Sequence, residues 1–409
     1  MTKYHIVALG GPGSGKTVYI SALYYLLAND KLAPGIRMKT SLAATSWLNE
    51  VFEQVSDPNN DFPPGTNPSS PMREVEFQIT CERMHRPWLF GNPRLLRFPV
   101  MEVSYVDYSG EWLTESHTQS TELLEAFESR LAEAHVILAF IDGERISRML
   151  LEPGSEVEYV NRELRPIVKL AEDQSSPIVI VLTKWDLLMA EFSLNQVVAA
   201  LMADESTNLR NLADARSAKS RLKRRPVGGV WLVPVSATGP NFARWDGAKR
   251  RVVKTGRGSP EPINVTIPFT IGITEIASVG LKEIKRAANR VNLRLTSDLN
   301  LDEGANIFTG EVPIGIAGVT LDLRKLLAFS GDLAIDALRI LSVPATRTGR
   351  MMRRGYRRVT ARGLDGVNSI EGALMHFSIA LRGQFDEFHE DPKNEVAHLW
   401  ADSDEWVAL

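Results

Sequence analysis

The stretch GGPGSGKTVYI at residues 10–20 decides the fold. It follows YHIVAL at residues 4–9, which has the composition of a buried strand, and it opens residues 16–27, where apolar side chains recur at helical spacing. The pattern GxxxxGK[ST] is matched by Gly10, Gly15, Lys16 and Thr17. Between a strand and a helix, such a loop directs backbone N–H groups and the helix N-terminus toward phosphates, which predicts a nucleotide site.

Lys16 and Thr17 are the residues of this loop that are expected to carry chemistry. Lys16 should reach the outer phosphates and assist their transfer, and the Thr17 hydroxyl should ligate Mg²⁺. A glycine turn that binds nothing has no need for Lys followed by Thr. The residues expected to hold the nucleotide here are Gly10, Gly13, Ser14, Gly15, Lys16, Thr17 and Val18.

Composition excludes several classes of protein. The chain has 409 residues, 44% of them apolar and 24% charged, which is typical of a soluble protein of two or three domains. The formal net charge of -3 gives no support for bulk binding to nucleic acid. Cys81 is the single cysteine and cannot form an internal disulfide, so we expect a reducing, cytoplasmic location. No apolar run approaches the ~18 residues of a membrane span.

The order of apolar segments predicts an α/β sheet. Two alternating segments, 74–82 and 97–106, are expected to form a hairpin, and three short runs rich in Val and Ile follow at residues 135–142, 177–186 and 229–237. Helix-like sequence separates the later runs, which indicates mostly parallel strands. A helix over residues 40–55 precedes a Pro-rich loop, and residues 241–262 are expected to be a linker or a loop.

The segment VDYSGE at residues 106–111 ends one of these strands. Asp107 is expected there to hold Mg²⁺ through water, because the carboxyl edge of the sheet adjoins the glycine loop. Gly110 supplies an N–H for the γ-phosphate and a point about which the next segment can swing. Glu111 follows it and is a candidate catalytic residue.

Two further motifs are expected to recognise the base. TKWD at residues 183–186 ends a strand, and the Asp186 carboxylate can accept hydrogen bonds from guanine N1–H and the exocyclic amine, a pair of donors that adenine lacks. The Lys184 stem can lie along the purine, and Thr183 can tie this loop to the glycine loop. After the last strand, Ser236 begins SAT, in which the Ala237 N–H would meet guanine O6.

In this order and on these elements, the four motifs resemble the translation-factor-related (TRAFAC, Ras-like) class of P-loop GTPases. The resemblance covers about residues 1–290 and implies a G domain with a mixed six-stranded sheet, whose strand near Glu74 runs antiparallel. It also implies GTP or GDP with Mg²⁺ and two switch segments. Thr183 replaces the usual Asn, Glu111 stands where many members carry Gln, and the segment from Lys16 to Asp107 is unusually long.

The long first switch contains FPPGT, and Thr66 is expected there to complete Mg²⁺ coordination in the triphosphate state, with Thr40 and Thr45 as competitors on a helix. The Glu111 carboxylate would repel the charge that develops on the γ-phosphate, but it could also accept a hydrogen bond from the attacking water. We therefore expect slow hydrolysis that a partner or self-association stimulates. The opening motif, FPPGT, DYSGE and the expected helical tail also look similar to the bacterial double GTPases of NTP-dependent conflict systems. That likeness implies a regulatory role with protein partners.

Residues 291–409 are expected to form a mainly helical extension. Residues 347–362 carry seven arginines and no acid, whereas residues 386–405 carry eight acids and one lysine. The basic segment could bind nucleic acid, anionic lipid or an acidic protein, it could pair with the acidic tail, or it could be a solvated basic face without a ligand. A second basic stretch, residues 216–225, is expected to be a solvated insertion.

The sequence favours a GTP-hydrolysing switch and leaves two alternatives open. An ATP-using P-loop enzyme would need a base site indifferent to Asp186. A scaffold that binds GTP without hydrolysing it is kept open by Glu111.

Overall fold

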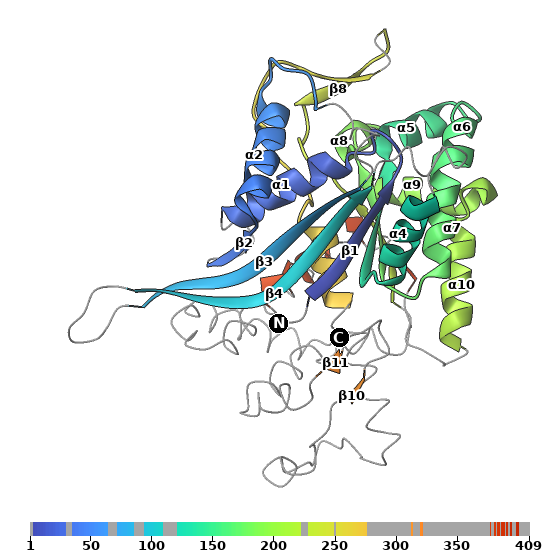
Figure 1. Ribbon diagram of the computed structural model, residues 1–409. Helices are drawn as coiled ribbons and strands as arrows, with labels where there is room; N and C mark the ends of the chain where they lie inside the picture. The colour runs from blue at the N-terminus through green and yellow to red at the C-terminus, as the bar shows by residue number, and fades with distance from the viewer. Residues whose placement is uncertain are drawn as a thin grey trace.

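The computed structural model describes residues 3–29, 35–63, 72–85, 94–108, 121–221, 228–248 and 251–275, together with one pair of two-residue strands at 312–313 and 320–321 and part of residues 377–400. Figure 1 shows the arrangement of these elements. Thr66, Gly110, Glu111 and the arginine-rich segment 347–362 lie outside the described residues.

The central feature is an eight-stranded sheet in the order β12-β7-β6-β5-β1-β4-β3-β2. The strands are β1 (Lys3–Gly10), β2 (Ile36–Lys39), β3 (Met72–His85), β4 (Arg94–Tyr108), β5 (Val136–Asp142), β6 (Ile178–Thr183), β7 (Val230–Pro234) and β12 (His398–Trp400). Strands β7 to β4 run parallel, while β3 runs antiparallel to β4 as the resemblance implied. The α/β class is confirmed, but the expected count of six strands is wrong because β2 and β12 extend opposite edges.

The parallel strands are apolar because helices exclude water from both of their faces. β5, β6 and β7 are buried along their whole length. Since neighbouring parallel strands end at the same edge, Asp107, Asp142 and Thr183 come together near the glycine loop that follows β1. β3 and β4 extend past the other strands as a long ribbon, visible in Figure 1.

The helices begin where the sequence supplies caps. The Ser41 side chain accepts from the Ala44 N–H at the start of α2, and Ser193 and Gln196 form a capping box on α9. The helices are α1 (Lys16–Ala28), α2 (Leu42–Ser56), α4 (Thr121–Ala132), α5 (Gly143–Leu151), α6 (Val157–Tyr159), α7 (Arg165–Asp173), α8 (Trp185–Leu188), α9 (Leu194–Ala203) and α10 (Leu209–Arg221). A π-helical turn, η1 (Val160–Leu164), joins α6 to α7, and a 3-10 turn, η2 (Glu205–Thr207), precedes α10.

The structure corrects two sequence predictions, one for residues 241–262 and one for Arg216. Residues 241–262 are not simply a linker or a loop, because β8 (Ala243–Asp246) and β9 (Arg251–Lys254) form an antiparallel hairpin. Arg216 does not belong to a solvated insertion, because its side chain is buried in α10 and donates to the Ala171 carbonyl at 3.2 Å. That burial lowers the pKa of Arg216 to about 10.

The C-terminal part of the chain returns to the sheet. β12 pairs antiparallel with β7, and the buried side chains of Phe377, Leu381 and Phe388 belong to the same core as the strands. Two two-residue strands, β10 (Val312–Pro313) and β11 (Thr320–Leu321), pair with each other. Among the described residues, none of the helices is long and apolar enough to span a bilayer.

Candidate nucleotide-binding site

The glycine loop joins β1 to α1 in the way the sequence predicted. Gly13 and Gly15 have φ values of 72° and 89°, which favour glycine. α1 begins directly after Gly15, which has no side chain to occupy the first N–H groups of the helix. The Lys16 ammonium is buried and donates to the Gly10 carbonyl at 2.8 Å and the Gly11 carbonyl at 3.1 Å. Burial lowers the pKa of Lys16.

Thr17 and Asp107 meet beside Lys16. The Thr17 hydroxyl donates to Asp107 Oδ2 at 3.0 Å, and Asp107 is 1% exposed. Burial raises the pKa of Asp107, and the nearby Lys16 charge opposes this shift. Asp107 Oδ1 is buried without a hydrogen-bond partner in the described part of the chain. The Thr17 hydroxyl and the Asp107 carboxylate, one oxygen of which lacks a hydrogen-bond partner among the described residues, fit a hydrated Mg²⁺ ion, which prefers oxygen ligands and keeps several waters.

Thr183 ties the base-reading loop to the glycine loop. Its hydroxyl lies 2.9 Å from the Ser14 carbonyl and 3.0 Å from the Ile141 carbonyl, and it can donate to one at a time. Lys184 has a left-handed backbone with φ 52°, and its ammonium donates to Asp142 Oδ2 at 2.6 Å. Threonine therefore makes the inter-loop contact at this position.

Asp186 is held by the SAT loop. Burial raises the pKa of the Asp186 carboxyl, while a hydrogen bond from the Ser236 hydroxyl lowers it. Ser236 Oγ accepts from the Gly239 N–H at 2.8 Å, so the turn after β7 orients Ser236 beside Asp186. Ala237 follows on the same turn and is half-buried.

One cavity of about 430 Å³ joins these groups. It is lined by glycine-loop residues 12–18, by Thr183, Lys184 and Asp186, and by Ala237. Gly10 lies behind this lining, where a Cβ would meet Ser14 Oγ at 2.7 Å. Thr40 and Thr45 are the other candidates for the Mg²⁺ ligand of the first switch. The Thr40 hydroxyl donates to the Glu76 carbonyl, and the Thr45 hydroxyl shares a hydrogen bond with the Tyr24 hydroxyl. The glycine loop and the two motifs predicted to recognise the base therefore line the same cavity.

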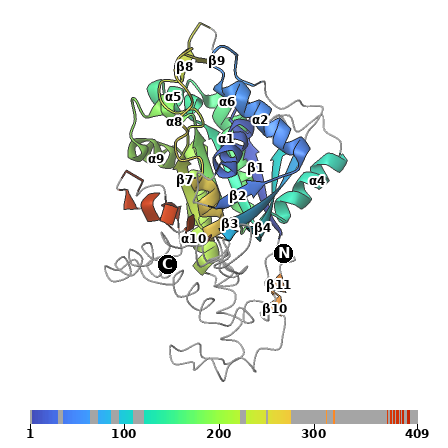
Figure 2. The same cartoon turned by 90° about the vertical axis from the view of Figure 1, so that its left-hand side faces the viewer.

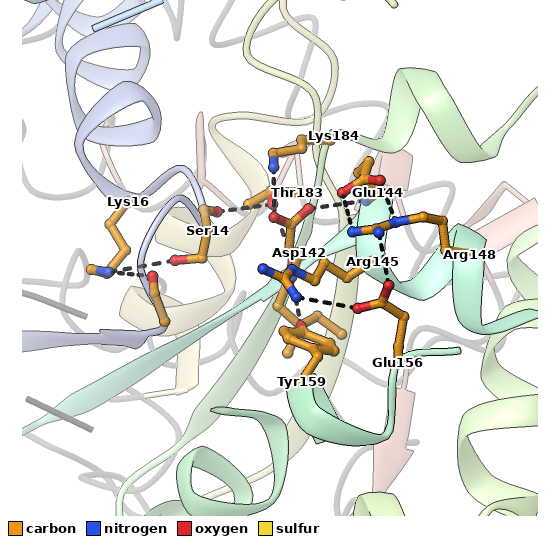
Figure 3. A network of polar contacts seen from close by, with 12 residues as sticks. Ser14, Lys16, Asp142, Glu144, Arg145, Arg148, Glu156, Tyr159, Thr183 and Lys184 are labelled. Carbon is orange, nitrogen blue, oxygen red and sulfur yellow. Dashed lines mark hydrogen bonds and ion pairs between the residues drawn. The ribbon is translucent and has the colours of Figure 1, made fainter. Parts of the chain in front are cut away.

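The structure adds a polar network that the sequence reasoning missed (Figure 3). Asp142, at the end of β5, accepts from the Glu144 N–H at 3.0 Å as well as from Lys184. Arg148 pairs with Glu144 at 2.6 Å and with Glu156 at 2.9 Å. Asp142 could have been found, because it ends an apolar strand as Asp107 does. Arg148 lies within a helix, where no sequence pattern marks it as a residue near the site.

These elements have the order and arrangement of a P-loop GTPase domain: the glycine loop, the strand-end Asp107 and the loops at residues 183–186 and 236–238 follow one another along a mixed α/β sheet, and the glycine loop and both later loops line one cavity. Residues 7–158 match the family model described as Double-GTPase 1, which confirms the resemblance to the double-GTPase family for that part of the chain.

The similarity of this chain to solved structures is weak. The S. cerevisiae Ski7 GTPase-like domain bound to GTP is 15% identical with a TM-score of 0.31, and the similarity covers 63% of this chain and 47% of that chain. The same domain bound to GDP and inorganic phosphate gives 15% identity, a TM-score of 0.31, and coverage of 57% and 43%. This chain therefore spans less than half of either neighbour. No curated protein matches it.

Proposed function

We propose that the protein is a Mg²⁺-dependent molecular switch that binds GTP and hydrolyses it to GDP. The observation that carries this proposal is the position of Asp186, which lines the same cavity as Lys16. A base contacting Asp186 could then belong to the nucleotide whose phosphates the glycine loop holds. The carboxylate matches the two donors of guanine, whereas adenine offers an acceptor at N1.

The residues around the phosphate loop have distinct parts in the proposed reaction. Lys16 and the N–H groups of the loop bind the β- and γ-phosphates and stabilise the charge that develops during transfer. Thr17 and Asp107 would hold Mg²⁺, which supplies charge neutralisation on the phosphates. We propose that Thr66 orders the first switch and that the Gly110 N–H contacts the γ-phosphate. Glu111 is proposed to position the attacking water.

The base assignment is tested with Asp186→Asn. An amide presents one donor and one acceptor, so the variant should lose GTP affinity by at least about tenfold and bind XTP instead, because xanthine carries a carbonyl where guanine has its amine. Asp173→Asn, an exposed aspartate at the end of α7, is the matched control. Binding of ATP by the wild type with the same affinity as GTP would contradict the proposal.

Hydrolysis is tested separately from binding. Phosphate release by the wild type without a partner should be slow, well below about 1 per second, as for GTPases that need an activator. Lys16→Ala should abolish it, because the ammonium no longer reaches the phosphates. A wild-type protein that binds GTP and releases no more phosphate than Lys16→Ala would instead be a scaffold.

The finer features of the proposal follow from the resemblance. We propose a G domain at residues 1–290, a mainly helical extension at residues 291–409, and a regulatory cytoplasmic role through a protein effector or activator in a conflict-type system. Self-association is a second route to stimulation. Whether residues 347–362 bind nucleic acid or an anionic membrane stays a prediction, which binding at two salt concentrations tests.

A further inference from the structure

The β8–β9 hairpin forms part of the wall of the nucleotide cavity. Trp245, Arg251 and Val252 line the same cavity as Lys16 and Asp186. The hairpin is a separate two-stranded sheet. Figures 1 and 2 both place it beyond the sheet, beside the chain that leaves α2. Side chains outside the four sequence motifs therefore border the cavity.

Trp245 is held in place by a cation on α5. The guanidinium carbon of Arg148 lies 4.9 Å from the centre of the indole ring. Arg148 is itself fixed by ion pairs to Glu144 and Glu156, both of which are largely buried. Because its partner is fixed, the half-buried Trp245 side chain, which lines the cavity, needs little further ordering to contact a ligand there.

The second strand of the hairpin is anchored to the loop that follows α2. The Lys254 ammonium donates to the Gln54 carbonyl at 2.5 Å and the Asp57 carbonyl at 2.7 Å. It also lies 5.0 Å from the centre of the Phe62 ring. Arg251 pairs with Asp61 at 3.2 Å. Since Phe62 also lines the cavity, this loop and the hairpin close one side of it together.

We propose that the hairpin is a clamp that retains the bound nucleotide, with Trp245 as a nucleotide-contacting residue. The inference rests on the proposed function and extends its binding site. Trp245 follows shortly after the SAT loop and lines the cavity, and an indole ring suits stacking on the nucleoside part of the ligand. By joining the SAT side of the cavity to the loop after α2, the clamp encloses the ligand between two segments far apart in the sequence.

The test is a chase experiment on the full chain loaded with radiolabelled GDP, in which the rate of label loss is followed after excess unlabelled GDP is added. Trp245→Ala should release GDP about tenfold faster, as expected for the loss of one stacked aromatic contact. Trp245→Phe should fall between this variant and the wild type. Arg244→Ala, an exposed neighbour on the same strand, should match the wild type. Melting temperatures of the nucleotide-free variants check that each one folds.

The outcomes separate this inference from the proposed function. If Trp245→Ala and Arg244→Ala both release GDP at the wild-type rate, the clamp is overturned and the GTP assignment stands. If the wild type retains ATP and not GDP, the GTP assignment is overturned, and the same series run with labelled ATP decides the clamp. A wild type that retains no purine nucleotide overturns both.

Discussion

At the scale of single residues, His135 shows how burial sets a proton equilibrium far from the nucleotide. It is 4% exposed, just before β5, and its Nδ1 accepts from the His5 N–H at 3.1 Å. Burial, and secondarily the charge of His5, lowers the pKa of His135 to about 4. The neutral imidazole is therefore part of the folded structure.

This depressed pKa predicts a loss of stability in acid. Unfolded His135 takes up a proton near pH 6.5, whereas folded His135 does so only near pH 4. The stabilisation is present above pH 6.5 and is lost as the pH falls toward 4, by about 3 kcal/mol. Urea unfolding between pH 7 and 4 measures it. Other acids titrate in this range, so the difference between wild type and His135→Gln is the relevant quantity, and parallel curves would refute the prediction.

At the scale of elements, the junction of β5 with α5 packs directly against the end of β6. A Cβ at Gly143 would lie 2.1 Å from the Thr183 carbonyl oxygen and 2.5 Å from Leu188 Cδ1. Because one of these atoms belongs to the backbone, neither loop can accommodate a methyl group without moving. The base-reading loop is thus positioned by a glycine outside its own motif.

Gly143→Ala should therefore displace the TKWD loop. We expect a loss of ~1–3 kcal/mol in unfolding free energy and at least about tenfold weaker GTP binding, because Asp186 shifts with the loop. Denaturant unfolding and equilibrium binding measure the two effects. Gly247→Ala is the control for the effect on stability, since the nearest atom to its Cβ would be Trp245 Nε1 at 4.0 Å, an ordinary van der Waals contact. Unchanged binding by Gly143→Ala would show that the loop tolerates the shift.

At the scale of the whole molecule, distant parts of the chain share one core. Phe377, Leu381 and Phe388 pack into it, and the Thr270 hydroxyl donates to Gln384 at 3.2 Å. β12 completes the edge of the sheet beside β7. The described residues after 376 therefore support the same fold as the nucleotide site, although they follow it by a long stretch of sequence.

Phe388→Ala should destabilise the protein as a core mutation does. The expected loss is ~3–5 kcal/mol, from burial of the ring and the space left behind. Leu42→Ala is the control, because Leu42 is 88% exposed and should change the free energy of unfolding by less than ~0.5 kcal/mol. Chemical unfolding followed by circular dichroism measures both variants. Equal stabilities would mean that the C-terminal segment contributes nothing to the core.

By itself, the sequence determined the positions of the glycine loop after β1, of Asp107 near the end of β4 and of residues 183–186 at the end of β6, while the phosphate-binding and base-reading roles of these residues stay predictions. The information is local in each case, because an apolar run and the few polar residues after it specify a strand end, and parallel strands bring such ends to one edge. The contact from Thr183 to the Ser14 carbonyl followed from that reasoning.

Only the tertiary structure decided which other segments border the cavity and which complete the sheet. Trp245 meets Arg148, Lys254 meets the end of α2, and β12 pairs with β7 through contacts between segments distant in sequence. Short strands such as β8, β9 and β12 have weak local patterns, because three or four residues give too little periodicity to distinguish a strand from a loop. Their positions depend on burial and pairing that exist only once the chain is folded.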